Sequence, residues 1–263
     1  QIRGIQSNRI MSTIKHWALN AQETGRMTVS SNIDDAAARQ SDFLAFEFAI
    51  EQSDPGSVMC AYNRVNGTYA CESDYLLNEV LKTDWGYKGF VMSDWGAVHS
   101  TAKAANAGLD QESAWTFDKQ PFFGAPLKAA VADGSVPQAR LDDMVRRITR
   151  SMFAHGLFDH PVSASAPIDL AAHAKVTQAD AEEGIVLLKN DGDLLPLAKT
   201  AKTIAVIGAH SDVGVLSGGG SSQVYPVGGR AVKGLEPATW PGPVIYYPSS
   251  PLKALLSMSN PAH

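Results

Sequence analysis

Long hydrophobic runs and blocks of like charge are missing from the sequence. The runs IVLL at 185–188 and IAVI at 204–207 fall far short of the roughly 20 apolar residues that a membrane helix needs. No cluster of Lys or Arg occurs, and 22 basic against 27 acidic residues give a net charge of −5. A surface that binds a phosphate backbone is therefore not expected, and we predict neither nucleic acid nor a membrane as a partner.

Two glycine-rich stretches lack the remaining features of a nucleotide site. AVIGAHSDVG at 205–214 misses the G-x-G-x-x-G pattern, because Ala209 and His210 follow Gly208. SGGGSS at 217–222 is not followed by the Gly-Lys-Ser/Thr of a phosphate loop. A loop that reaches toward the pocket of another domain is the better interpretation of this second stretch.

Cysteine is scarce, with only Cys60 and Cys71, and they flank the segment AYNRVNGTYA. Two thiols that bracket a turn can form a disulfide, which would suit an oxidising compartment. Two small buried thiols are the alternative, and the spacing does not decide between them. No histidine is near either cysteine in sequence, so a metal site is not expected. The opening QIRGIQSNRI is typical of mid-domain sequence, so the lack of a signal peptide says little.

The first half alternates short apolar runs with helical patterns, which favours parallel strands joined by crossover helices. One helix is predicted over 35–51. Another lies between the second and third strands, with Ser73 as its cap and Gly86 as its stop. The predicted strands cover 13–17, 58–62 and 90–92, with a short fourth over 106–110.

A clear amphipathic helix begins after Pro137 and ends before Gly156. The next segment, 158–169, is small, polar and rich in proline, which indicates a domain boundary. Beyond it we predict a helix over 170–183, a tight turn at Asp191-Gly192 between extended arms, and a buried strand within 202–212. The apolar stripe predicted for the helix after Pro137 is Leu141, Met144, Val145, Ile148, Met152 and Phe153.

Asp94 stands at the end of the third predicted strand, directly before Trp95. In parallel α/β barrels this end of the strands carries the active site. The carboxylate can cap the next helix or pair with a cation. It can also be a nucleophile or base, with Trp95 as an apolar wall. Because sugar rings pack their CH faces on aromatic rings, a carboxylate beside tryptophan is a reasonable signature of a sugar site.

Polar residues also end the other two strands. Lys15 and His16 close the first one, where both must be solvated or paired. They can donate hydrogen bonds to sugar hydroxyls in a pocket, or they can be a plain surface pair. Tyr62 closes the second strand, where its hydroxyl can reach a neighbouring carboxylate, or its ring can simply line a barrel rim.

Taken in order, these motifs resemble glycoside hydrolase family 3, in its β-glucosidase branch. The matching text is GIQSNRIMSTIKHWALNAQETGR, VMCAYNRVNGTYACESDYLLNEVLKTDWGYKGFVMSDWGA, AEEGIVLLKNDGDLLPL, IAVIGAHSD and GGGSS. It covers nearly the whole chain apart from 111–126 and the last few residues. The family's N-acetylglucosaminidases continue KH as KHFPGHG, and its β-xylosidases usually carry SDC where this chain has SDW. Both differences favour a glucosidase.

The resemblance implies an α/β protein, a (β/α)8-type barrel followed by an α/β sandwich, with the active site where the two domains meet. We then expect 1–158 to be the C-terminal portion of the barrel, 159–183 a linker and helix, and 184–263 the beginning of the sandwich. A barrel needs eight strands over roughly 250 residues, and only about four are visible before the linker. The chain is therefore expected to be a fragment, inactive alone, whose partner is the remainder of the same enzyme.

The resemblance also implies a chemistry and a set of roles. It is a retaining double displacement in which a second carboxylic acid, roughly 5–5.5 Å from the nucleophile, protonates the leaving oxygen. No metal or organic cofactor is needed. The family's acid/base is a glutamate expected outside this chain, and Glu236 matches no acid/base motif. The implied site has Asp94 as nucleophile. Lys15, His16 and Tyr62 would hold the sugar or orient Asp94, Trp95 would stack on the sugar, and Ser221 or Ser222 would touch it.

The expected activity is hydrolysis of terminal non-reducing β-D-glucosyl residues from an oligosaccharide or an aryl β-glucoside, as in cellulose degradation. A β-xylosidase or a broad β-glucan exohydrolase of the same family is one alternative. A catalytically silent carbohydrate-binding relative is another, although an intact SDW argues against it. The cysteine pair and the habit of the family favour a periplasmic or secreted protein.

Overall fold

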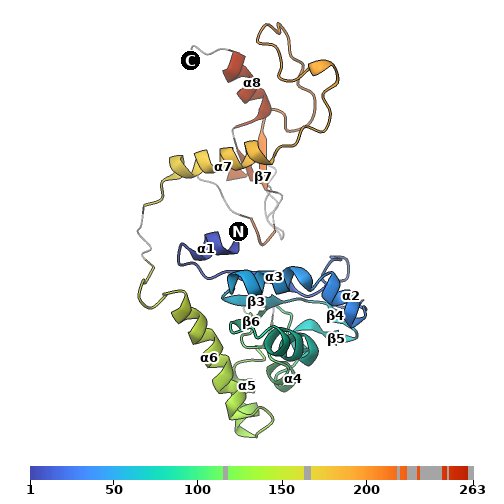
Figure 1. Cartoon of the computed structure of the whole chain (residues 1–263), viewed down its shortest axis with the longest axis vertical. Helices are drawn as coiled ribbons and strands as arrows, with labels where there is room; N and C mark the ends of the chain where they lie inside the picture. Colours follow the sequence, from blue (N-terminus) through green and yellow to red (C-terminus); the bar gives the residue numbers. More distant parts are fainter. Residues whose placement is uncertain are drawn as a thin grey trace. The chain divides into compact units, whose positions relative to one another are not determined.

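The computed structural model describes residues 1–114, 118–162, 167–217, 220–223, 230–231, 245–247 and 249–259. The chain forms two compact units, 1–167 and 168–263, and Figure 1 colours it from blue at the N-terminus to red at the C-terminus. The division falls within 158–169, where the sequence places a linker. No helix of the described part is long and apolar enough to span a membrane.

A three-stranded parallel sheet, in the order β1-β3-β6, forms the centre of the first unit. Its strands are β1 (Thr13–Trp17), β3 (Ser57–Cys60) and β6 (Phe90–Ser93). All three were predicted, although β3 ends at Cys60 because Tyr62 already belongs to the turn that follows. All residues of β3 are buried, as expected for the middle strand of a covered parallel sheet.

The predicted fourth strand is reduced to a single bridge between Met92 and Gln111. Its first residue, Asn106, instead ends helix α4 (Ala102–Asn106). The Asp110 carboxylate accepts a hydrogen bond from the Val91 amide at 2.8 Å. That side chain therefore takes the place of the backbone carbonyl that a regular ladder would supply.

The segment predicted as one helix over 35–51 forms two, α2 (Asp35–Gln40) and α3 (Leu44–Ser53). Asp34 caps α2 by accepting a hydrogen bond from the Ala37 amide. The chain turns before α3, and the ring of Phe43 is fully buried there, 4.6 Å from the ring of Trp17. Burial of this aromatic side chain compensates for the interrupted helix.

The helix between β3 and β6 is π-type and covers Tyr75–Asp84. The N-cap is Asp74, one residue after the predicted Ser73, but the Ser73 Oγ does accept a hydrogen bond from the Leu76 amide of the first turn at 3.3 Å. The predicted apolar stripe is fully buried against the sheet. Its members are Leu76, Leu77, Val80 and Leu81.

Helices α5 (Ala125–Ala132) and α6 (Gln138–Ala154) complete the first unit. The prediction of a helix after Pro137 was right. The prediction of its buried face was wrong for Val145 and Phe153, because both side chains are exposed. Arginine side chains occupy part of the inward face because they find acceptors in the interior. The side chains that turn inward are Arg140, Met144, Arg147 and Ser151.

Shorter elements surround this core. Helix α1 (Ile2–Gln6) precedes β1. A small second sheet in the order β2-β4-β5 follows the loops at the strand ends. Its strands are β2 (Ser30–Ser31), β4 (Arg64–Val65) and β5 (Thr68–Tyr69), and a 3-10 turn at Ala70–Glu72 leaves the last of them.

The second unit contains the predicted helix as α7 (Leu170–Gly184), and Asp191–Asp193 forms the predicted turn. The strand predicted within 202–212 is not formed, and Ile207 there is 92% exposed. An apolar segment forms a strand only when a partner supplies a ladder, and no described segment pairs with it. The remaining elements are β7 (Gly214–Ser217), β8 (Arg230–Ala231), β9 (Ile245–Tyr247) and α8 (Pro251–Ser259), with the sheet antiparallel in the order β7-β9-β8.

Candidate active site

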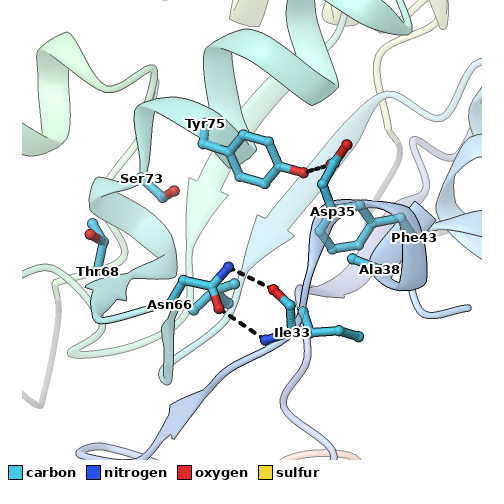
Figure 2. A pocket seen from close by; sticks show the side chains of 9 residues that line it. Ile33, Asp35, Ala38, Phe43, Asn66, Thr68, Ser73 and Tyr75 are labelled. Carbon is cyan, nitrogen blue, oxygen red and sulfur yellow. Dashed lines mark hydrogen bonds between the residues drawn. The ribbon is translucent and has the colours of Figure 1, made fainter.

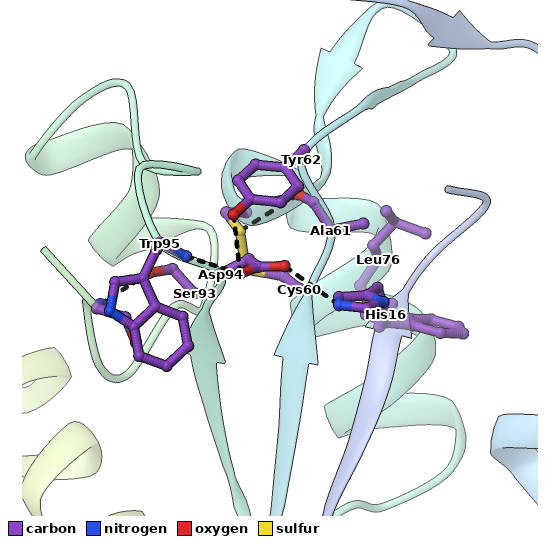
Figure 3. The surroundings of a disulfide bond; sticks show 11 residues. His16, Cys60, Ala61, Tyr62, Leu76, Ser93, Asp94 and Trp95 are labelled. Atoms are coloured by element: carbon purple, nitrogen blue, oxygen red, sulfur yellow. Dashed lines mark hydrogen bonds and ion pairs between the residues drawn. A yellow bond between two sulfur atoms is a disulfide. The ribbon is translucent and has the colours of Figure 1, made fainter. Parts of the chain in front are cut away.

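Asp94 is the point at which the carboxyl ends of the three parallel strands meet. It directly follows β6, and its amide donates to the Cys60 carbonyl at the end of β3. Figure 3 shows the three strands side by side, with Asp94 beyond their tips. The residue is buried, with 8% of its surface exposed. Strand geometry thus fixes the backbone of this carboxylate on two sides.

Three donors from three chain segments surround the Asp94 side chain (Figure 3). His16 Nε2, from β1, lies 3.2 Å from Oδ2. The Tyr62 hydroxyl, from the turn after β3, donates to Oδ1 at 3.0 Å. The Trp95 amide donates to the same oxygen at 2.8 Å. The carboxylate therefore has a fixed orientation as well as a fixed position.

These donors determine the charge of the site. Burial raises the pKa of Asp94, but the hydrogen bonds from His16, the Trp95 amide and Tyr62 outweigh it, so the pKa lies below its usual value. Burial and the neighbouring Asp94 charge raise the pKa of Tyr62. At neutral pH, Asp94 is thus an ionised acceptor and Tyr62 a protonated donor. An ionised carboxylate held in this way is suited to nucleophilic attack.

Trp95 presents a large aromatic surface beside the carboxylate, with 43% of the residue exposed. It lines a hollow of about 710 Å³ together with Glu112, Ser113, Asp118 and Pro121 among others. An exposed indole at the rim of a hollow offers a face on which a sugar ring can pack. The burial of Asp94 and the exposure of Trp95 place a reactive group and a binding surface next to each other.

Comparisons with family models and with known relatives identify the family of this chain. Residues 1–151 match the glycosyl hydrolase family 3 N-terminal domain, and 185–257 match the C-terminal domain of that family. The chain belongs to glycosyl hydrolase family 3. The N-terminal domain of the family is of the TIM-barrel type, which agrees with the α/β class predicted from the sequence.

Three family members illustrate the similarity. "Probable beta-glucosidase L" of Neosartorya fischeri is 45% identical over 225 residues, covering 81% of this chain and 30% of the relative. "Thermostable beta-glucosidase B" of Acetivibrio thermocellus is 40% identical over 228 residues, covering 86% and 29%. The crystal structure of beta-D-glucoside glucohydrolase from Trichoderma reesei has a TM-score of 0.70 and 42% identity, covering 75% and 28%. This family 3 chain thus spans about 30% of the length of the curated relatives it matches.

Two other residues predicted to bind sugar, Lys15 and Ser221, lie in different units of the chain. Lys15 is exposed and lines a different hollow, together with Ile2, Ile5 and Met11 of the N-terminal segment. Ser221 and Ser222 are exposed in a turn of the second unit, and Glu236 lies outside the described residues.

Arg26 is a part of the site that the sequence reasoning missed. Its guanidinium lies over the Tyr62 ring, 4.5 Å from the centroid, and Glu23 pairs with it at 2.8 Å. The other residues of the site stand at strand ends, whereas Arg26 follows a glycine turn at Gly25 in the loop after β1. A basic residue in the conspicuous motif QETGR was the available signal.

The cysteine alternatives are resolved in favour of a disulfide between Cys60 and Cys71, whose Cα atoms lie 5.3 Å apart. Both cysteines are fully buried. The bridge lies at the base of the β4–β5 hairpin and is drawn in Figure 3 beside Asp94, whose amide donates to the Cys60 carbonyl. The pair that was ambiguous in the sequence is therefore a structural neighbour of the candidate nucleophile.

A further hollow of about 310 Å³ lies between α2 and the β4–β5 hairpin (Figure 2). Three of its polar side chains, those of Asn66, Tyr75 and Asp35, already bond other residues of the lining. Asn66 exchanges two 2.9 Å hydrogen bonds with the Ile33 backbone, and the Tyr75 hydroxyl bonds Asp35. None of the site residues predicted from the sequence lines it, so we do not place substrate there.

Proposed function

We propose that this chain supplies the nucleophile of a retaining β-glucosidase, which removes terminal non-reducing β-D-glucosyl residues from an oligosaccharide or an aryl β-glucoside. The observation that carries the proposal is the ionised Asp94 at a strand end, held by three donors beside an exposed tryptophan. The names of the family relatives support glucose as the sugar.

In the first step, an Asp94 oxygen attacks the anomeric carbon. A carboxylate–carbon bond forms as the glycosidic bond breaks, and the leaving oxygen receives a proton from a second carboxylic acid. In the second step, that group removes a proton from water, which displaces Asp94 and restores the original configuration. We propose a glutamate of the family's second domain for this role and assign it to no residue of this chain. Two carboxylates suffice, so no step requires a metal or an organic cofactor.

The chain's own residues prepare Asp94 for this attack. His16, Tyr62 and the Trp95 amide keep it ionised and oriented without adding a covalent partner. When the carboxylate becomes an ester, it loses its charge and these hydrogen bonds weaken. They strengthen again as the ester breaks, so the same donors favour release of Asp94 in the second step.

The disulfide supports a secreted or periplasmic location, because such bridges persist in oxidising compartments. Degradation of cellulose-derived oligosaccharides is the role we propose. The remainder of the enzyme is then the partner of this chain, since the curated relatives are about three times as long as the matched region.

The test is to trap the covalent intermediate on the intact native protein with a 2-deoxy-2-fluoro β-glucoside. Mass spectrometry should show one fluoroglucosyl adduct on the peptide that contains Asp94. An Asp94→Asn variant that keeps the circular dichroism spectrum of the folded parent should show none. An adduct on another carboxylate would refute the nucleophile assignment. No adduct on a folded protein that binds glucose would support a silent carbohydrate-binding relative instead.

A further inference from the structure

The Cys60–Cys71 disulfide closes a segment that carries one of the groups contacting Asp94. Cys60 is the last residue of β3, and Cys71 lies in the 3-10 turn that follows β5. Between them the chain forms the β4–β5 hairpin, with Asn66 and Gly67 in the left-handed conformation that its tight turn requires. The bridge therefore joins the two arms at the base of the hairpin.

Asp94 contacts this bridged segment at two places. Its amide donates to the Cys60 carbonyl at 3.3 Å, and its Oδ1 accepts from the Tyr62 hydroxyl at 3.0 Å. Tyr62 is only two residues beyond Cys60 and lies outside every strand. The position of its hydroxyl consequently depends on how the base of the hairpin is held.

The two arms of the hairpin are held in different ways. The outgoing arm is hydrogen-bonded to the segment around the end of β1, with Ala61 N donating to Trp17 O at 2.7 Å and Asn63 Nδ2 donating to Ala18 O at 3.2 Å. The returning arm has one described backbone bond to the base, from Ala70 N to Asn63 O at 3.0 Å. The disulfide adds the covalent connection between this arm and β3.

We propose that the Cys60–Cys71 disulfide is a positioning element of the active site, which keeps the Tyr62 hydroxyl within hydrogen-bonding distance of Asp94. This inference rests on the proposed function. Loss of the bridge lets the base of the hairpin open and lengthens that bond. The effect should therefore fall on the chemical step rather than on sugar binding, because Tyr62 acts through the nucleophile.

A weaker bond from Tyr62 also makes the ionised carboxylate less stable, so the acidic limb of the rate profile should move to higher pH. The other titratable group in contact with Asp94 is His16 from β1. Arg26 and Glu23, from the loop after β1, act on Tyr62. These three are unchanged when the bridge is removed, so the shift reports on Tyr62.

The experiment compares three variants of the full-length enzyme on 4-nitrophenyl β-glucoside. These are Cys60→Ala/Cys71→Ala, Tyr62→Phe, and the combination of all three changes. Loss of a hydrogen bond to a charged group predicts a fall in kcat of about 10-fold for either of the first two, with KM nearly unchanged. The pKa of the acidic limb of the pH–rate profile should rise in both the bridge variant and Tyr62→Phe. The combination should be little worse than Tyr62→Phe alone, because the bridge then has no hydroxyl left to position.

Val136→Ala is the matched control. Val136 is fully buried in a separate cluster with Leu127 and Met144, so truncating it lowers stability without touching the hairpin. The unfolding temperature of Val136→Ala should fall, while kcat and the pKa of the acidic limb stay as in the parent enzyme. Multiplicative losses in kcat for bridge removal and Tyr62→Phe would overturn the proposal, as would a bridge variant that only loses stability.

If the alanine pair does not fold, the native enzyme is reduced and alkylated below its unfolding temperature, and the pH profile is measured again. Loss of the fold in this experiment too would overturn the proposal, because the bridge would then hold the whole unit. The fluoroglucoside label separates the two levels of inference. Absence of label at Asp94 refutes the proposed function, whereas labelling with multiplicative losses refutes the positioning role alone.

Discussion

Asp110→Asn is predicted to destabilise the protein far more than an ordinary change of charge. The Asp110 side chain has no exposed surface and contacts three donors. They are the Val91 amide at 2.8 Å, Lys82 Nζ at 3.1 Å and the guanidinium of Arg140. An asparagine of the same shape can still accept from Val91, but it removes the negative charge that two largely buried cations share.

The size of the destabilisation depends on the hydrogen-bond acceptors that Arg140 and Lys82 keep after the substitution. Removal of one partner from a buried ion pair costs about 3–5 kcal/mol. Arg140 keeps Asp143 and two backbone carbonyls, and Lys82 keeps the Gly108 carbonyl and can lose its proton, since burial lowers its pKa to about 8. We therefore expect the lower limit, about 3 kcal/mol, which corresponds to a fall in unfolding temperature of about 6–12 °C.

Denaturant unfolding followed by circular dichroism measures this loss, and Asp143→Asn is the control. Asp143 also pairs with Arg140 and Arg147, but its side chain is 31% exposed. Its loss should cost only about 1 kcal/mol or less. If the two substitutions cost the same, burial of Asp110 is not what makes its pairing strong, and the reasoning fails.

Three further predictions follow from the same structure. The pKa of Asp94 is lowered in the folded protein, so its ionisation stabilises the fold above the unfolded pKa of about 3.9. This contribution is lost as the pH falls through the pKa of the folded state. Urea unfolding of the parent and of Asp94→Asn from pH 6 to 3 should therefore show the difference between their free energies of unfolding shrinking. The pKa of Lys82 is lowered to about 8, so between about pH 8 and 10 the unfolded state binds more protons than the folded one. The stability of the parent relative to Lys82→Met should therefore rise across that range, and a constant difference would contradict it. Trp95→Ala should raise the dissociation constant for glucose at least about tenfold while the unfolding temperature changes little. The reason is that a half-exposed indole contributes more to ligand binding than to the core. Calorimetry on the intact enzyme measures the dissociation constant, and a thermal scan measures the unfolding temperature.

The strand order and the meeting of polar residues at one edge could be predicted because they depend on local pattern. Short apolar runs separated by helical stripes indicate parallel strands, and the carboxyl ends of parallel strands share one edge of the sheet. His16, Tyr62 and Trp95 therefore come together around Asp94 as the residue order suggested. Lys15 instead lines a hollow with residues of the N-terminal segment, which the order of polar residues did not indicate.

The failures arise where tertiary contacts override the local pattern. Periodicity counts apolar residues, so it could not show that Arg140 and Arg147 of α6 face inward toward carbonyl groups and Asp110. Nor could it show that the helix predicted over 35–51 breaks to bury Phe43 against Trp17. The apolar run at 204–207 reads as a strand, but a strand exists only where another segment completes its ladder.

Asp110 and the disulfide each hold one partner of the hydrogen bond between Tyr62 and Asp94. Asp110 holds β6 at Val91, three residues before Asp94, and the bridge holds the hairpin base two residues before Tyr62. Both perturbations are expected to lengthen the Tyr62–Asp94 hydrogen bond, which can be lost only once. Asp110→Ala, which removes the acceptor of the Val91 amide, combined with removal of the bridge should therefore lower kcat by less than the product of the separate effects, while their losses of stability add, because the two sites share no direct contact. Multiplicative losses in kcat would show instead that β6 and the hairpin position different groups of the active site.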